Sequence, residues 1–326
     1  MILFITNKQD ITTDIIINKL NQRDTPYFRL NTEDIFAHTQ VSFDFSDNIY
    51  HLLDTEGNVL LDLDDVDSVY YRRPELPGVV LDNLLSEEKH FVLNEAFYSL
   101  EGLYKLLSDR YWLNSVFSIR EAENKIYQLT LAKNIGFDIP ESIITSNEKD
   151  AREFILSHNN DCILKPIKSG QVGESEDSQI IFTNALDEKH IKELNRINGY
   201  PTYFQECLHK KSDIRVTVVG EQIFAAKIHS QDFDDTKVDW RKGESVKLSY
   251  SEYTLPKEVK KKCYVLLEIL HLNFGAIDFV ETTDDRLVFL EINPNGQWGW
   301  IEKRLGLQIS DEIIRLLNEA HYVKIK

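Results

Sequence analysis

The sequence predicts an α/β protein with an N-terminal α/β domain followed by two α+β lobes that enclose a cleft. Three observations support this prediction. The chain has 326 residues, 42% of them apolar, and at roughly 150 residues per domain this length favours two or three domains. Short apolar runs alternate with helical patterns from the first residue onward, as in layered α/β folds. A helix start signal near residue 118 separates the first domain from the rest.

Residues 1–115 form the predicted N-terminal domain. Its apolar runs are short enough for buried strands, and they alternate with segments of helical spacing. The predicted strands are Met1–Thr6, Tyr27–Leu30 and Val66–Tyr71, and the predicted helices are Ile11–Leu20 and Ser86–Asp109.

A capping box predicts the start of the next helix at Ser118. The Ser118 hydroxyl can accept from the first-turn amides, while Glu121 reaches back to the Ser118 amide. Apolar residues then recur on one face until Gly136, which is a typical helix stop. We therefore expect a central lobe at residues 116–205 and a C-terminal lobe at residues 206–326.

Further strands and helices alternate in both lobes. In the central lobe, the predicted strands are Cys162–Lys165, Gln179–Thr183 and Thr202–Glu206, and the predicted helices are Lys149–Ser157 and Asp187–Asn195. In the C-terminal lobe we expect a tight hairpin of Ile214–Val219 and Gln222–Ile228, a helix at Lys257–Leu270, strands at Gly275–Val280 and Arg286–Asn293, and a last helix at Ser310–Ala320.

Charge and composition exclude several classes of partner. The chain has 37 Lys and Arg against 54 Asp and Glu, a net charge of −17, whereas duplex binding needs clustered basic residues. Cys162, Cys207 and Cys263 lack metal-binding spacing, so we expect reduced thiols in the protein core. The sequence shows no signal peptide and no run of ~20 apolar residues. We therefore expect a soluble cytoplasmic protein with no nucleic-acid or membrane partner.

Three oxygen-bearing side chains near the C-terminal end give the strongest chemical signal. Glu291 and Asn293 project from one face of a strand because side chains alternate along it, with Phe289 expected behind them. Asp278, on the neighbouring strand, faces Glu291 if the two strands form a hairpin. We expect no Lys or Arg on this face, so a divalent cation must balance the carboxylates, and all-oxygen ligation favours Mg²⁺. The alternative is a solvent-facing hairpin whose acidic residues only raise solubility.

Four spaced cations complement this acidic set: Lys125, Lys165, Arg215 and Lys227. Each one alone reads as a solvated surface charge. Together with the Gly-containing loop that follows Lys165, they suit the three phosphates of a nucleotide whose Mg²⁺ occupies the acidic site. Other chemistries lack their motifs, since the sequence has no GxSxG, HExxH or GxGxxG pattern.

Taken in order, these features are similar to the ATP-grasp superfamily of carboxylate–amine ligases. Several segments are more specifically similar to graspetide synthetases, the ATP-grasp enzymes that macrocyclise ribosomal peptides, as in microviridin maturation. These segments include Tyr71-Arg72-Arg73-Pro74, Asn124-Lys125-Ile126-Tyr127-Gln128-Leu129, Asp239-Trp240-Arg241 and Glu291-Ile292-Asn293-Pro294-Asn295-Gly296-Gln297-Trp298. The resemblance covers nearly the whole chain. It implies an ATP-grasp fold of two α+β lobes that hold the nucleotide in the cleft between them.

The resemblance also implies roles for individual residues. ATP and Mg²⁺ would be the cofactors, with Mg²⁺ held by Asp278, Glu291 and Asn293 and the nucleotide held by Lys125, Lys165, Ser169, Gly170, Glu206, Cys207, Leu208 and Asp213. The catalytic candidates are Arg215 and Arg241, since a planar guanidinium suits a carboxylate or a departing phosphate, together with the cation Lys227. The substrate candidates are Arg72, Arg73, Asp239, Asn295 and Trp298. An equally good interpretation of Trp298 is an aromatic residue of the protein core. Arg72 and Arg73 could likewise simply end a strand.

These expectations describe a ligase that activates Asp or Glu side chains of a ribosomal precursor peptide as acyl phosphates and joins them to Ser or Thr hydroxyls or Lys amines. One alternative is an ATP-grasp ligase that adds free amino acids to a protein or peptide tail. Another is a non-catalytic module that binds nucleotide or peptide. The expected partner is the leader and core of the precursor peptide, and the resemblance makes a homodimer plausible.

Overall fold

The computed structural model describes residues 1–75, 77–78, 84–168, 171–172, 179–180, 182–245 and 248–323. These residues form two compact units. The first contains Met1–Ile119, His271–Phe274 and Asn295–Lys326, and the second contains Arg120–Leu270 and Gly275–Pro294. The first change from one unit to the other, between Ile119 and Arg120, lies close to the domain boundary expected after residue 115. The chain after residue 294 belongs to the first unit, however, whereas the sequence predicts it in the C-terminal lobe.

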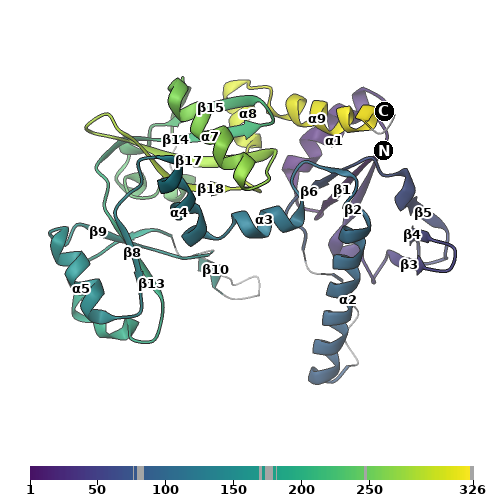
Figure 1. Ribbon diagram of the computed structural model, residues 1–326, viewed down its shortest axis with the longest axis horizontal. Helices are drawn as coiled ribbons and strands as arrows, with labels where there is room; N and C mark the ends of the chain where they lie inside the picture. Colours follow the sequence, from purple (N-terminus) through teal and green to yellow (C-terminus); the bar gives the residue numbers. More distant parts are fainter. Residues whose placement is uncertain are drawn as a thin grey trace. The chain divides into compact units, whose positions relative to one another are not determined.

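The first unit is built on a parallel sheet in the order β2-β1-β6-β7 (Figure 1). Every residue of β1 is buried, as expected for a parallel strand with helices on both faces of the sheet. The strands are β1 (Ile2–Thr6), β2 (Tyr27–Asn31), β6 (Ser68–Tyr71) and β7 (Tyr111–Trp112), and the helices are α1 (Ile11–Gln22), α2 (Ser86–Leu106), α8 (Gly299–Leu305) and α9 (Ile309–Val323).

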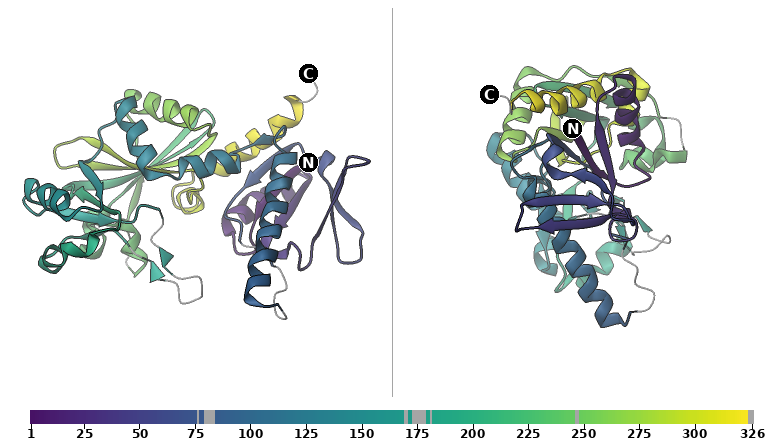
Figure 2. Two further views of the ribbon diagram at one scale, coloured as in Figure 1. Left: turned by 60° about the horizontal axis from the view of Figure 1, so that its bottom comes forward. Right: turned by 90° about the vertical axis from the view of Figure 1, so that its right-hand side faces the viewer.

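A three-stranded antiparallel meander fills the stretch between β2 and β6. It consists of β3 (Gln40–Asp44), β4 (Ile49–Leu53) and β5 (Val59–Asp62), where the sequence predicts only a polar segment. Leu52 and Leu61 of the meander join Leu103 of α2 and the β1 side chains in one apolar core. Figure 2 shows α2 lying along the parallel sheet and the meander beside it.

Two helices replace the single helix predicted from Ser118. They are α3 (Val116–Ala122) and α4 (Lys125–Ile135), and α4 begins at a cap of its own, Asn124, whose side chain accepts a first-turn amide. The predicted capping box at Ser118 is wrong, because Ser118 lies inside α3 and its amide donates to the Ser115 hydroxyl at 3.0 Å.

The second unit contains a smaller antiparallel sheet in the order β12-β9-β13-β8. Ala151 and Ile155 of α5 pack against Phe204 of β13 in its core. The strands are β8 (Ser142–Thr145), β9 (Cys162–Lys165), β12 (Asn184–Ala185) and β13 (Thr202–Glu206), the helices are α5 (Glu148–Ser157) and α6 (Glu188–Lys192), and β10 (Gln171–Val172) pairs with β11 (Gln179–Ile180).

A five-stranded sheet in the order β16-β15-β14-β17-β18 forms the rest of the second unit. The hairpin predicted around Gly220 is confirmed by the pairing of β14 with β15, and Gly136 ends α4 in the left-handed region with φ 91° as predicted. The strands are β14 (Lys210–Val219), β15 (Gln222–Ile228), β16 (Tyr250–Glu252), β17 (Phe274–Thr282) and β18 (Leu287–Asn293), and α7 (Lys257–Ile269) packs beside α4 (Figure 1).

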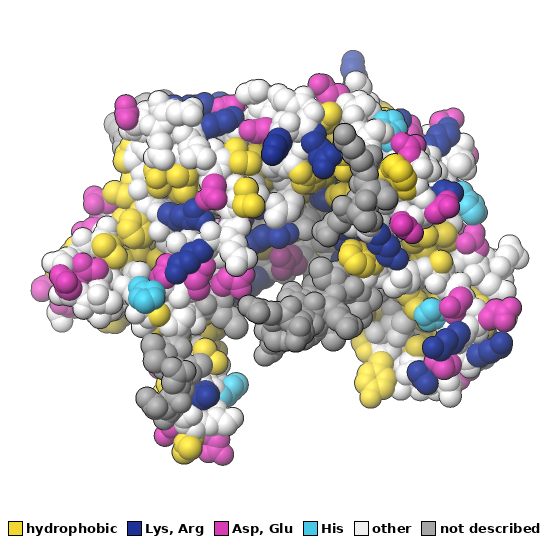
Figure 3. All heavy atoms as spheres, turned by 180° about the vertical axis from the view of Figure 1, so that it is seen from behind, with side chains coloured by type: hydrophobic (Ala, Val, Ile, Leu, Met, Phe, Trp, Pro, Cys, Tyr) yellow, Lys and Arg dark blue, Asp and Glu magenta, His cyan; other side chains and the backbone are white. Residues whose placement is uncertain are grey.

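The described surface mixes charges of both signs. On the face drawn in Figure 3, basic, acidic and apolar side chains are interspersed. No described helix combines the length and apolar character that crossing a membrane requires.

Candidate functional site

The hairpin of β17 and β18 brings the predicted metal ligands together. Asp278 lies directly opposite Glu291, and Asn293 lies opposite Ala276 on the same antiparallel pair. The predicted facing of the two carboxylates is therefore confirmed. Because residues two apart on a strand share a face, Asn293 lies on the same side as Glu291.

A β-bulge changes the surroundings of Glu291. Phe279 pairs with Phe289, so Leu290 is an extra residue between two registered pairs. Strict alternation predicts Phe289 beside Glu291, and this prediction is wrong. Phe289 is fully buried and packs on Phe279 and Phe137, with ring centroids 5.8 and 5.3 Å away. The bulge thus separates an apolar core from a polar face within one short strand.

Each facing carboxylate has a cationic partner. The Lys125 ammonium lies 2.9 Å from Glu291 Oε2, and Arg215 Nε lies 3.2 Å from Asp278 Oδ1. The expectation that this face lacks Lys and Arg is therefore wrong, because α4 and β14 bring cations from distant parts of the sequence. Two carboxylates this close repel each other, and these cations supply the balance in the metal-free protein.

The two carboxyl groups have opposite pKa shifts. Burial raises the pKa of Asp278, Arg215 counteracts this only in part, and Glu291 adds to the rise. Burial also acts to raise the pKa of Glu291, but Lys125 and Lys165 outweigh it and hold that pKa well below its usual range. Glu291 is therefore ionised near neutral pH, and Asp278 is the easier of the two to protonate.

Lys165, at the end of β9, adds a second ammonium group. Burial lowers the pKa of Lys165 to about 8, although the nearby Glu291 carboxylate acts to raise it. Lys125 also donates to the Pro166 carbonyl at 3.3 Å, so the start of α4 and the end of β9 lie side by side. A desolvated ammonium is stabilised by a bound anion such as a phosphate.

Arg215 is 6% exposed, yet its Nε and Nη1 atoms lack a hydrogen-bond acceptor among the described residues. Its ion pair with Asp278 is the charge contact at this position, and its guanidinium carbon lies 5.8 Å from the centre of the Trp240 ring. Buried donors without acceptors are rare in folded proteins. The unused Arg215 donors therefore suit an oxygen of an anionic ligand.

Arg241 is held by Asp239 in a bidentate pair. Arg241 Nε and Nη2 donate to the two Asp239 oxygens at 2.9 and 2.8 Å, and the Thr183 amide donates to the same carboxylate at 3.3 Å. Burial acts to raise the pKa of Asp239, but Arg241 lowers it further than burial raises it. Asp239 is thus bonded by Arg241, while the Arg241 side chain stays 48% exposed.

Four of the residues expected to hold the nucleotide lie where β13 leads into β14, between the two sheets of the second unit: Glu206, Cys207, Leu208 and Asp213. Both oxygens of Asp213 accept from Lys210 Nζ, at 2.8 and 2.7 Å, and Asp213 is buried. The Glu206 side chain, at the end of β13, accepts the Glu141 amide at 2.8 Å. The chain continues from there through Cys207 and Leu208 into β14.

Lys227 is not brought to this cluster. Directly opposed strand residues share a face, and Lys227 opposes Ile214 while Arg215 opposes Ala226, so Lys227 and Arg215 lie on opposite faces of the sheet. Lys227 pairs with Glu281 at 2.7 Å. The register therefore corrects its predicted catalytic role.

The two loop residues predicted to contact nucleotide, Ser169 and Gly170, lie outside the described residues.

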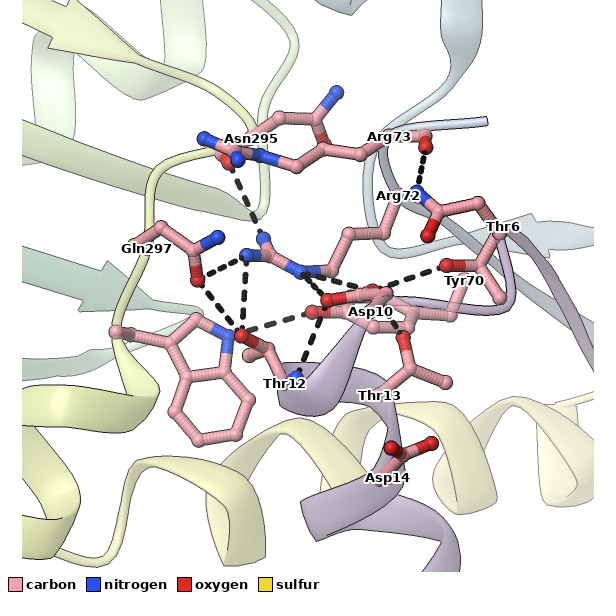
Figure 4. Close-up of polar contacts among 12 residues, drawn as sticks. Thr6, Asp10, Thr12, Thr13, Asp14, Tyr70, Arg72, Arg73, Asn295 and Gln297 are labelled. Atoms are coloured by element: carbon pink, nitrogen blue, oxygen red, sulfur yellow. Dashed lines mark hydrogen bonds and ion pairs between the residues drawn. The ribbon is translucent and has the colours of Figure 1, made fainter. Parts of the chain in front are cut away.

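Arg72 is 1% exposed and is fully engaged within the first unit. Its predicted contact with an acidic substrate is wrong, because its guanidinium is buried against Asp10 and the loop after β18 (Figure 4). Arg72 donates to the Asn295 and Gly296 carbonyls at 3.2 and 3.3 Å and to Gln297 Oε1 at 2.8 Å, and its Nε lies 3.2 Å from Asp10 Oδ2.

Trp298 is likewise a core residue. Its ring is fully buried, and its indole Nε1 donates to the Tyr70 hydroxyl at 3.3 Å. The predicted substrate contact is therefore wrong, and the alternative interpretation as a core aromatic holds. Asn295 keeps part of its surface exposed, but its carbonyl is used by Arg72.

Arg73, in contrast, is exposed and lines a pocket of about 450 Å³ in the first unit. The pocket lies at the carboxyl ends of β1 and β6, where connections of a parallel sheet diverge and ligands commonly bind. Lys303, Trp300 and Gln297 add a cation, an aromatic ring and an amide to a lining that also contains the acidic residues Asp10 and Glu75. Gln297 Oε1 accepts from Thr12 and Arg72, which leaves the amide NH₂ of Gln297 for a ligand.

Sequence reasoning assigns no role to Gln128, although the side chain is 2% exposed and contacts the strand that carries the ligands. Its amide bonds the backbone of Ile292, between Glu291 and Asn293. The sequence feature that could have indicated a role is the spacing of Gln128, which lies three residues after Lys125 and therefore on the same face of the helix.

These residues fit Mg²⁺ and ATP. Asp278, Glu291 and Asn293 offer only oxygen atoms to a metal, as Mg²⁺ prefers, and three protein ligands leave positions for water and phosphate. No described group joins three or more His, Cys, Asp or Glu around a metal position, so the amide of Asn293 is needed to complete the set. The unsatisfied donors of Arg215 and the desolvated Lys165 suit phosphate oxygens. Magnesium would supply charge neutralisation at those oxygens.

Comparisons with known proteins identify the two domains of the chain. Residues 1–120 match the MvdD pre-ATP grasp domain, and residues 122–317 match the RimK-like ATP-grasp domain. A Chryseobacterium gregarium RiPP-associated ATP-grasp ligase, solved with ADP and a leader and core peptide, is 28% identical, covers 98% of this chain and 96% of its own, and has a TM-score of 0.88. The macrocyclase MdnC from Microcystis aeruginosa, bound to precursor peptide MdnA, is 28% identical over 98% of this chain and 100% of its own, with a TM-score of 0.86.

A probable alpha-L-glutamate ligase from Haemophilus influenzae is 24% identical over 207 residues. That match spans 62% of this chain and 65% of the length of the relative. The RimK-like match covers the second unit and the helices that follow it, and the MvdD-like match covers the parallel sheet. ATP and Mg²⁺, the predicted cofactors, are those of ATP-grasp ligases. The chain belongs to the RimK-like ATP-grasp family, with a pre-ATP-grasp domain in front.

Proposed function

We propose that this chain is an ATP-dependent ligase that crosslinks side chains of a ribosomal precursor peptide. The γ-phosphoryl group of ATP passes to an Asp or Glu carboxylate, which gives an acyl phosphate and ADP. A Ser or Thr hydroxyl or a Lys amine of the same peptide then attacks the acyl carbon, loses its proton, and displaces inorganic phosphate. The product is an ester or amide crosslink.

The observation that carries this proposal is the cluster around the Asp278–Glu291 pair. Two carboxylates and an amide oxygen suit a magnesium ion, while Lys125 and Lys165 suit phosphates. Arg215 and the exposed fork of Arg241 are the groups we assign to the acyl phosphate, because catalysis of phosphoryl transfer consists mainly of positioning and charge neutralisation.

A peptide substrate is supported by the two ligases that share the fold along nearly the whole chain, since both were solved with peptides bound. The pocket lined by Arg73 and Lys303 supplies cations in a protein of net charge −17. Its aromatic and amide lining suits an acidic side chain with apolar neighbours. We assign part of the precursor peptide to this pocket.

Mass spectrometry of purified enzyme with ATP, Mg²⁺ and candidate precursor peptides tests the proposal. Loss of one water per crosslink, with stoichiometric ADP, is the expected result. A gain in mass by whole amino-acid residues when free amino acids are supplied would instead support a tail-adding ligase, the function that the glutamate-ligase relative favours. Nucleotide binding without turnover on any peptide or amino acid would support a binding module.

A further inference from the structure

The outer edge of β18 is covered by a helix rather than by another strand. β18 is the last strand in the order β16-β15-β14-β17-β18, so among the described residues one side of its backbone pairs with no named strand, apart from an isolated bridge between Val288 and Asp138. Backbone N–H and C=O groups on a buried edge need hydrogen-bond partners. Along this edge, the Phe289 N–H donates to the Asp138 carbonyl at 2.8 Å. Further along the strand, the N–H and C=O groups of Ile292 point outward and bond the side chain of Gln128.

The side-chain amide of Gln128 pairs with Ile292 as a neighbouring strand would. Gln128 Oε1 accepts the Ile292 N–H at 3.0 Å, and Gln128 Nε2 donates to the Ile292 carbonyl at 2.8 Å. Nε2 also donates to the Ala122 carbonyl. The Gln128 Nε2 group thus faces two carbonyls, and Oε1 faces an N–H group. This fixes the orientation of the amide, because a flipped amide would place its oxygen against the carbonyls and its NH₂ against the N–H.

Ile292 connects the two ligands contributed by β18. Its N–H belongs to the peptide bond shared with Glu291, and its C=O belongs to the peptide bond shared with Asn293. Gln128 therefore holds both peptide planes from which these two side chains project. Three residues earlier on α4, Lys125 holds the Glu291 carboxylate itself at 2.9 Å, so one face of α4 contacts both the side chain and the backbone of the ligand segment.

We propose that Gln128 is a positioning residue for the metal ligands Glu291 and Asn293. Groups that orient metal ligands without touching the metal are worth about 10–100-fold in metal affinity. A structural role alone would lower stability and leave metal affinity unchanged. This inference rests on the metal assignment made above, and the experiment separates the two.

The test substitutes Gln128→Met, which keeps the length and apolar stem of the side chain and removes its three hydrogen bonds. Mn²⁺ binding to nucleotide-free protein, followed by electron paramagnetic resonance, is the main readout. We expect the Mn²⁺ dissociation constant to rise about 10–100-fold. In metal-free protein, hydrogen exchange over residues 289–293 should quicken, a readout that does not depend on activity.

Gln205→Met is the matched control, because Gln205 is a buried glutamine of β13 whose amide donates to Tyr203 and Ser142 at 2.7 and 3.0 Å. It should lower the melting temperature without changing Mn²⁺ affinity. Gln128→Glu is the second variant: when protonated it keeps an acceptor for the Ile292 N–H and one donor for the facing carbonyls, so its Mn²⁺ affinity relative to that of Gln128→Met should be higher at acidic pH and should fall as the buried carboxyl group ionises.

Unchanged Mn²⁺ affinity in Gln128→Met, or an equal loss in Gln205→Met, overturns the inference. If neither Gln128 variant folds, the residue is structural and the inference also fails. Absence of Mn²⁺ binding to the wild-type protein would instead overturn the metal assignment.

Discussion

The Lys125 ammonium and the Glu291 carboxylate lie 2.9 Å apart and join the first turn of α4 to β18. In the metal-free protein this ion pair holds the pKa of Glu291 low, against the effect of burial. A divalent cation that binds Glu291 competes with Lys125 for the same oxygens. We therefore expect metal binding to release the ammonium towards the phosphates of a bound nucleotide.

Glu291→Gln should weaken Mn²⁺ binding by at least about 100-fold, since a ligand is worth more than the 10–100-fold typical of groups that only orient ligands. ADP formation should be lost with it. Mn²⁺ titration and an ADP assay measure the two effects. Glu281→Gln is the control, because Glu281 lies on the same strand pair but bonds Lys227 and Ser212; it should retain the wild-type metal affinity. Wild-type Mn²⁺ affinity in Glu291→Gln would refute the metal site.

Lys165→Met should stabilise the ligand-free protein while weakening nucleotide binding. Burial lowers the folded-state pKa of Lys165 to about 8, below its ordinary value of 10.5. Between these pH values the unfolded chain binds more protons than the folded chain, so wild-type stability gains from this group as pH rises through the window. Below pH 8 the buried charge destabilises the fold. The variant should therefore melt a few degrees higher at pH 7, and the gap should close towards pH 10.

Calorimetry of both proteins across this pH range checks the Lys165 prediction. Lys133→Met, at an exposed position of α4, is the matched control and should change the melting temperature little. A Lys165→Met gap that stays constant from pH 7 to pH 10 would contradict the prediction.

Arg241→Ala should lower both stability and product formation while sparing ATP binding. The substitution leaves the buried Asp239 carboxylate without its bidentate partner. Adding Asp239→Asn removes the uncompensated charge, so the double variant should regain stability but not activity. Urea unfolding and product mass form a double-mutant cycle that separates the two roles. Recovery of activity together with stability would show that Arg241 acts only through the fold.

Arg72 and Arg73 are neighbours in sequence with opposite surroundings. Arg72→Met should destabilise the fold by about 3–5 kcal/mol, because it leaves Asp10 buried without its ion pair. Arg73→Met should change stability by less than about 0.5 kcal/mol and should raise the KM for the peptide. Urea unfolding and peptide kinetics measure the pair. Equal destabilisation, with no change in peptide KM for Arg73→Met, would argue against the pocket.

Short sequence patterns correctly predicted the features that depend only on residues close together in the sequence. The αL stop at Gly136, the turn at Gly220 and the facing of Asp278 and Glu291 follow from short-range geometry. The predicted helix start at Ser118 was wrong because several nearby polar residues can cap a helix. Ser118 lies inside α3, and the side chain of Asn124 caps the longer helix α4.

Contacts between residues far apart in the sequence could not be predicted from such short patterns. The bulge at Leu290, the burial of Arg72 and the bonds of Gln128 to Ile292 each depend on a partner more than ten residues away. Lys227 shows the same limit, because one residue of register decides which face of a sheet a side chain occupies.

The amino-acid sequence by itself determined the alternation of strands and helices outside the β3–β5 meander, the acidic pair with its asparagine, and the resemblance to the ATP-grasp family. Only the tertiary structure decided which cations stand beside that pair and which arginine is buried. The reason is that spacing along a chain sets which side chains share a face of one element, whereas charge balance and burial depend on what packs against that face.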